Sequence, residues 1–142
     1  MADPGQDPAF AIRISRTLPA APGRVWQALT DPAALCSWFW PESAFGTTAE
    51  VDLGEGYRID GPKAGLSLTG RYITVEPPDR LVMTWQWAGE DDATLVTIEL
   101  APDAGGTGMT LAHDGFADRT IRDEHMQGWT DCLARLPAWL SA

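Results

Sequence analysis

Two histidines are the side chains in this sequence best suited to proton transfer near neutral pH, because imidazole titrates there. His113 ends the segment MTLAH, where it alternates with Met109 and Leu111, and His125 lies in a later segment of helical periodicity. Both are therefore expected on the apolar sides of their elements. A histidine placed there is a candidate general acid or base, and equally a core residue with hydrogen-bonded ring nitrogens.

Motifs for nucleophilic, metal or phosphate chemistry are missing from the sequence. Cys36 and Cys132 are far apart and lack CxxC spacing, which predicts two reduced, buried thiols. Together with the two histidines they do not form the regular short spacing of a structural zinc site. The chain contains neither GxSxG nor GxGxxG. We therefore expect no metal and no cofactor.

Seven tryptophans are many for a chain of 142 residues. Indole is difficult to bury completely, so this number predicts either an unusual core or a partly lined cavity. Trp40, directly before Pro41, is expected at the mouth of such a cavity or at a dimer contact. The residues expected to line the cavity, with His113 as its polar group, are Trp38, Tyr57, Tyr72, Trp85, Trp87, Met109, His113, Met126 and Trp129.

Acidic residues outnumber basic residues by 20 to 10, which gives a formal net charge of −10. This charge argues against nucleic acids and anionic membranes as partners. No apolar run approaches the roughly 18 residues of a membrane span, and the start MADPGQDPAF lacks the basic and apolar regions of a signal peptide. These features predict a cytoplasmic protein that binds neither nucleic acid nor membrane. The cavity expected from the tryptophans predicts a small hydrophobic or aromatic molecule as its partner.

We expect a single domain over residues 10–142, after a flexible tail at 1–9. This domain must position the candidate site residues. Alternating apolar residues from position 10 predict a first strand. Pro22 suits the first turn of a short helix that ends at Thr30. Asp31 and Pro32 then predict the N-cap and first residue of a second short helix, which stops at Pro41.

Residues 47–113 have the alternation and turn residues of strands. The expected strands are 47–53, 55–60, 66–75, 80–88, 93–101 and 107–113, separated by Gly-, Pro- and Asp-rich turns. Connections this short leave no room for crossover helices, so the strands must form an antiparallel meander. In the clearest strand Leu81, Met83, Trp85 and Trp87 share one face.

A long amphipathic helix is predicted at the end of the chain, capped by Asp118 or Thr120. Its apolar positions recur every three or four residues and are Ile121, His125, Trp129, Cys132, Leu133 and Leu136. Pro137 is expected to kink or end it near Leu136. Gly128 in its middle costs about 1 kcal/mol relative to alanine, and such a glycine commonly allows close approach of a backbone or a bulky ring.

Three passages in this order resemble one known family: LPAAPGRVWQALTDPAALCSWF, GRYITVEPPDRLVMTWQW, and TGMTLAHDGF followed by EHMQGWTDCLARL. The family is that of activator of heat-shock-protein-90 ATPase-like proteins, within the START-like (SRPBCC) superfamily, and the likeness covers about residues 10–140. It implies an α+β helix-grip fold, in which a six- to seven-stranded antiparallel sheet wraps around the long C-terminal helix. Two short helices follow the first strand, and an apolar cavity lies between the long helix and the sheet.

The leading hypothesis for function is a single-domain protein that binds a small, largely apolar molecule in this cavity. One alternative is a cyclase- or hydratase-type enzyme that uses His113 or His125 as an acid–base group. Another is a co-chaperone-like regulatory module that acts through its surface. Binding is favoured over catalysis because no catalytic set of the superfamily maps onto these residues. A homodimer is compatible with each hypothesis.

Overall fold

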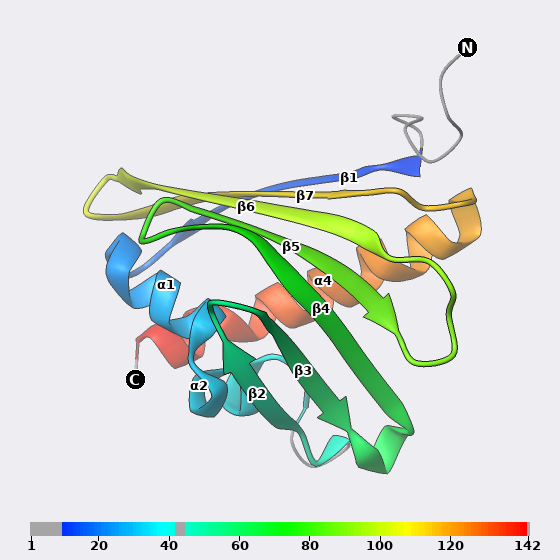
Figure 1. Ribbon diagram of the computed structural model, residues 1–142. Helices are drawn as coiled ribbons and strands as arrows, with labels where there is room; N and C mark the ends of the chain where they lie inside the picture. The colour runs from blue at the N-terminus through cyan, green and yellow to red at the C-terminus, as the bar shows by residue number, and fades with distance from the viewer. Residues whose placement is uncertain (1–9, 42–44, 142) are drawn as a thin grey trace.

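Seven antiparallel strands form a single sheet in the computed structural model, which describes residues 10–41 and 45–141 (Figure 1). The tail expected at residues 1–9 lies outside this range. The strands are β1 (Ile12–Leu18), β2 (Thr48–Asp52), β3 (Gly56–Gly61), β4 (Leu66–Glu76), β5 (Arg80–Trp87), β6 (Thr94–Asp103) and β7 (Gly106–Asp114). The helical elements are α1 (Pro22–Thr30), α2 (Pro32–Trp38), the 3-10 turn η3 (Pro62–Ala64) and α4 (Arg119–Leu140).

The strand order is β1-β7-β6-β5-β4-β3-β2. Strands β2 to β7 thus form the predicted antiparallel meander, and β1 joins it beside β7. Helices α1 and α2 connect β1 to β2 at the opposite edge of the sheet. Figure 1 shows the sheet curved around α4, with α1 and α2 near the C-terminal end of that helix. The predicted α+β arrangement is confirmed.

Aspartate caps define the starts of two helices. The Asp31 carboxylate accepts a hydrogen bond from the Ala34 backbone N–H at 3.0 Å, as predicted for α2. Asp118, and not Thr120, caps α4 by accepting from the Ile121 N–H at 2.8 Å.

Of the two outcomes predicted for Pro137, a kink or an end of the helix near Leu136, the end is wrong, because α4 continues through Pro137 to Leu140. A proline removes one helical hydrogen bond but leaves the later turns possible if other contacts hold them. Leu140 is buried here, and the Arg24 guanidinium lies 3.8 Å above the Trp139 ring. These contacts hold the last turn in place.

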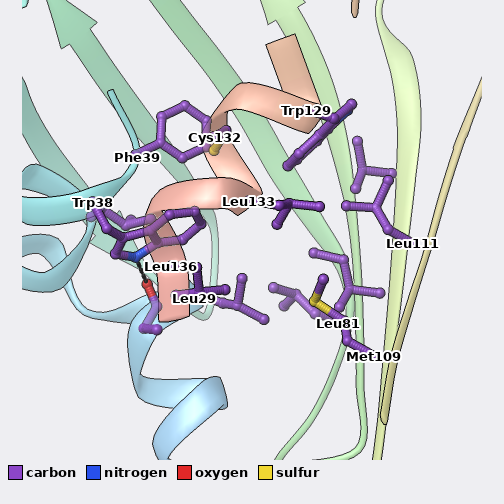
Figure 2. Packing of buried hydrophobic residues seen from close by; sticks show 14 of the residues in the cluster. Leu29, Trp38, Phe39, Leu81, Met109, Leu111, Trp129, Cys132, Leu133 and Leu136 are labelled. Atoms are coloured by element: carbon purple, nitrogen blue, oxygen red, sulfur yellow. Dashed lines mark hydrogen bonds between the residues drawn. The ribbon is translucent and has the colours of Figure 1, made fainter. Parts of the chain in front are cut away.

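One side of α4 is buried against the sheet and the short helices (Figure 2). Leu133 and Leu136 lie there, and burial of a leucine side chain stabilises a fold by about 1.5–3 kcal/mol. The surrounding side chains in Figure 2 include Leu29, Trp38, Leu81, Met109 and Leu111. In the part of the chain that the structure describes, no helix is both long and apolar enough to cross a membrane.

Candidate functional site

An enclosed space lies in the interior among α1, α2, the sheet and Trp129 of α4. It measures about 20 Å³, which is room for roughly one water molecule. Six aromatic rings line it, those of Trp38, Phe39, Tyr57, Tyr72, Trp85 and Trp129. The ring centroids of Trp85 and Trp129 are 5.0 Å apart, those of Trp38 and Phe39 5.7 Å, and those of Phe39 and Trp85 6.1 Å. These rings therefore act mainly as core.

A larger cleft of about 340 Å³ opens beside this core, between α4, the end of β5 and the segment after α2. Its lining residues are Phe39, Trp40, Leu66, Trp85, Trp87, Glu90, Ile121, Glu124, His125, Gly128, Trp129 and Cys132. Phe39, Trp85 and Trp129 also line the small interior space. These three rings thus separate the cleft from the core.

Arg135 fixes one wall of the cleft. Its Nε donates to the carbonyl oxygen of Trp38 at 3.1 Å, and its Nη2 donates to that of Phe39 at 2.8 Å. Both carbonyls end α2, where the negative end of the helix dipole favours a cation. The contact holds the next residue, Trp40, so that its ring stacks on Trp87 with centroids 6.1 Å apart.

Strand β5 supplies the opposite wall. Trp85 and Trp87 share one face of the strand, as the alternation predicts, and their rings meet edge to face at 85° with centroids 5.8 Å apart. Trp85 is 6% exposed, and its Nε1–H has no hydrogen-bond partner among the described residues. A buried donor without an acceptor is costly to the folded state.

His125 lies on the α4 wall with both ring nitrogens occupied. Its Nδ1 is 2.8 Å from the carbonyl oxygen of Ile121, and because a carbonyl can only accept, Nδ1 carries the proton. Its Nε2 accepts from the Trp87 indole N–H at 2.8 Å. Neither nitrogen of this neutral tautomer offers the cleft a free lone pair.

His113 is a fully buried core residue and does not line the cleft. Its Nδ1 accepts from the Trp129 indole N–H at 3.0 Å. Nε2 therefore carries the proton and donates to Thr94 Oγ1 at 2.6 Å, and this hydroxyl donates in turn to the carbonyl oxygen of Trp85 at 3.3 Å. The hydrogen bonds orient the tryptophans of the cleft from behind.

Stability should fall as the pH drops below 6.5 because of His113. Burial, and secondarily the nearby His125, lowers the pKa of His113 from 6.5 to about 2. Between these values the unfolded chain binds a proton that the folded chain does not, so the free energy of unfolding decreases by about 1.4 kcal/mol per pH unit. Urea unfolding at pH 7, 6 and 5 measures this slope.

This dependence of the unfolding free energy on pH should disappear in His113→Phe. It should persist in His125→Gln, which retains the buried imidazole of His113. The same slope in the His113→Phe variant would contradict its assignment to this residue. The comparison does not go below pH 5, so most carboxylates remain ionised in both states.

The cleft also contains a thiol and two carboxylates. Burial raises the pKa of the Cys132 thiol to about 12, so the thiol stays protonated and is a poor nucleophile. Glu90 and Glu124 are exposed at the rim. Within residues 10–41 and 45–141, no three His, Cys, Asp or Glu side chains are grouped closely enough to hold a metal ion.

Of the residues expected to bind a ligand, the structure brings Trp85, Trp87 and Trp129 to the cleft. Trp38, Tyr57 and Tyr72 line the small interior space instead, and burial raises the pKa of both tyrosines. The remaining three, which line neither space, are Met109, His113 and Met126. Whether any of these residues binds a ligand stays a prediction.

The residues of the cleft that were not among the expected ligand-binding residues lie mostly on α4 and after α2. Two of them were predicted in other roles, His125 as a candidate acid–base group and Trp40 at a cavity mouth or a dimer contact. The α4 positions Ile121, His125, Gly128 and Cys132 follow one helical stripe at steps of four, three and four residues. Gly128, in the middle of that stripe, is the sequence feature that could have identified this side of the helix as part of a cleft. A Cβ built at Gly128 would meet no atom within 4 Å, so this glycine opens the cleft and does not serve a close contact.

Comparisons with known proteins agree with the fold. The family model of the Activator of Hsp90 ATPase homolog 1-like proteins matches residues 19–141. Protein CV1439 from Chromobacterium violaceum is 30% identical, with a TM-score of 0.78, over 93% of this chain and 97% of that one. CalU16 from Micromonospora echinospora is 26% identical, with a TM-score of 0.71, over 92% of this chain and 76% of that one.

DynU16, from the dynemicin biosynthetic locus, is 25% identical with a TM-score of 0.79. The match covers 93% of this chain but only 47% of DynU16. A Plasmodium falciparum Hsp90 activator, 20% identical over 92% of this chain and 96% of that one, shares the fold with a TM-score of 0.75. No curated protein matches this chain.

Proposed function

This chain belongs to the Activator of Hsp90 ATPase homolog 1-like family, and from that premise we propose that it binds a small, largely apolar aromatic molecule. The binding site is the cleft between α4, the end of β5 and the segment after α2. The observation that carries the proposal is its volume of about 340 Å³, walled by the rings of Phe39, Trp40, Trp85, Trp87 and Trp129. Pockets of this size with aromatic walls and few polar groups are typical of small-molecule sites.

Burial of the ligand's apolar surface provides the driving force, at roughly 25 cal/mol per Å². Binding is favoured over acid–base catalysis because His113 and His125 each accept an indole N–H and donate from the other nitrogen. A general base needs a free lone pair at the substrate.

A larger side chain at position 128 can block the cleft without changing the hydrophobic core. A leucine side chain at position 128 would project into the cleft, since nothing occupies the space around its Cβ. We expect Gly128→Leu to weaken binding of the neutral dye N-phenyl-1-naphthylamine about tenfold or more, because an overlap of this kind costs about 1–3 kcal/mol. The measurement is a fluorescence titration of the dye with purified protein.

Gly128→Ala is the matched control. Its methyl group leaves most of the cleft open, so the dye should bind as it does to the unchanged protein. Alanine in a helix should also raise the free energy of unfolding by about 1 kcal/mol. Equal dye binding by the leucine and alanine variants, or no binding by the unchanged protein, would contradict the proposed site.

A further inference from the structure

We infer that the ligand of this cleft is an organic cation, an aromatic compound that carries a protonated amine or a quaternary ammonium group. The inference rests on the proposed function and specifies the charge of its ligand. Three features of the cleft support it: the arrangement of its indole rings, the sign of the charges on its rim, and the pairing of those charges.

The indole rings offer faces to a cation. A group seated in the angle between two rings that meet edge to face lies against a face of each, and Trp85 and Trp87 meet in this way at 85°. The face of an aromatic ring carries negative charge and attracts cations, and tryptophan does so most strongly. Trp40, which stacks on Trp87, and Trp129 extend the aromatic wall on either side.

Among the described residues, all charged side chains that line the cleft are acidic. They are Glu90, in the turn after β5, and Glu124, on α4. All ten Lys and Arg residues lie within the described part of the chain, and none of them lines the cleft. Asp91 and Asp92 follow Glu90 directly, and the chain has a net charge of −10, so the mouth attracts positive ligands and repels negative ones.

The two rim carboxylates are also available to a ligand. The ion pairs of the described residues are Arg13–Asp114, Arg58–Asp60 and Arg122–Asp123, and neither Glu90 nor Glu124 takes part in one. The ligand would therefore place its charge at the rim and its aromatic body deeper in the cleft.

Three probes with the same aromatic body and different charge test this inference. They are 1-naphthylmethylamine, which is a cation at pH 7, the neutral 1-naphthylmethanol, and the anion 1-naphthoate. Each competes with N-phenyl-1-naphthylamine for the cleft, and the loss of dye fluorescence gives its affinity. The amine should bind about tenfold more tightly than the alcohol, and the carboxylate more weakly than the alcohol.

The double variant Glu90→Gln/Glu124→Gln should remove most of the amine's advantage and leave the affinity of the alcohol unchanged. The control is Glu50→Gln/Glu76→Gln, which changes the net charge equally at carboxylates outside the cleft and should keep that advantage. Equal binding of amine and alcohol to the unchanged protein would overturn the cation inference and leave the proposed site intact. Failure of the dye and all three probes to bind would overturn both.

Discussion

Replacing His113 by alanine is expected to lower the free energy of unfolding by about 3–5 kcal/mol. The side chain is fully buried, so its removal leaves a cavity. The buried Trp129 N–H loses its acceptor, and the half-buried Thr94 Oγ1 loses its donor. Urea unfolding followed by tryptophan fluorescence at pH 7.5, where imidazole is neutral in both states, measures the loss.

His125→Ala is the control for this prediction. It removes the same side chain from a half-buried position on α4, and the Trp87 N–H that it leaves can reach water at the cleft. The expected loss is about 1 kcal/mol. Equal losses of stability in the two variants would show that the hydrogen bonds around His113 do not cause the loss in His113→Ala.

The order and type of the elements followed from local patterns. Short turns between alternating segments left an antiparallel meander as the only arrangement, and Asp31 and Asp118 marked helix starts that the structure confirms. The end of α4 did not follow in this way. Whether a helix continues past Pro137 depends on tertiary contacts, here the burial of Leu140, that no local pattern contains.

The candidate site was predictable only in part, because alternation assigns a side chain to a face and not to a depth. Trp85 and His113 were correctly placed on the apolar sides of their strands. His113 is nevertheless sealed behind the rings of Trp85 and Trp129, while Trp87, at the end of β5, reaches the cleft. The cleft itself combines α4, β5 and the segment after α2, and only the folded chain brings these together.

A second large effect is expected from Gly70→Ala, which should lower the free energy of unfolding by about 3 kcal/mol or more. Gly70 lies in β4 opposite Tyr57 of β3. A Cβ at this position would overlap the Thr84 carbonyl oxygen of β5 and the ring of Tyr57. Gly23→Ala is the control, because a Cβ there meets nothing within 4 Å. Urea unfolding of both variants measures the difference.

Neither neighbour of Gly70 can move independently. The Tyr57 hydroxyl donates to the Thr84 carbonyl oxygen at 2.6 Å, and Thr84 Oγ1 accepts from the Arg71 backbone N–H at 2.8 Å. Adding Tyr57→Val to Gly70→Ala relieves the overlap with the ring but not the overlap with the carbonyl. A double-mutant cycle should therefore recover only part of the loss. A Gly70→Ala variant within 1 kcal/mol of the unchanged protein would contradict this rigid contact.

The contact at Gly70 also bears on the cleft, because β4 and β5 pair from Leu68↔Trp87 to Glu76↔Arg80. A methyl group that pushes the Thr84 carbonyl away displaces β5 next to Trp85, and with it the corner formed by Trp85 and Trp87. Gly70→Ala should therefore weaken binding of N-phenyl-1-naphthylamine even at temperatures where the variant remains folded, whereas Gly23→Ala should not. Unchanged dye binding by folded Gly70→Ala would show that the aromatic wall keeps its geometry independently of the β4–β5 register.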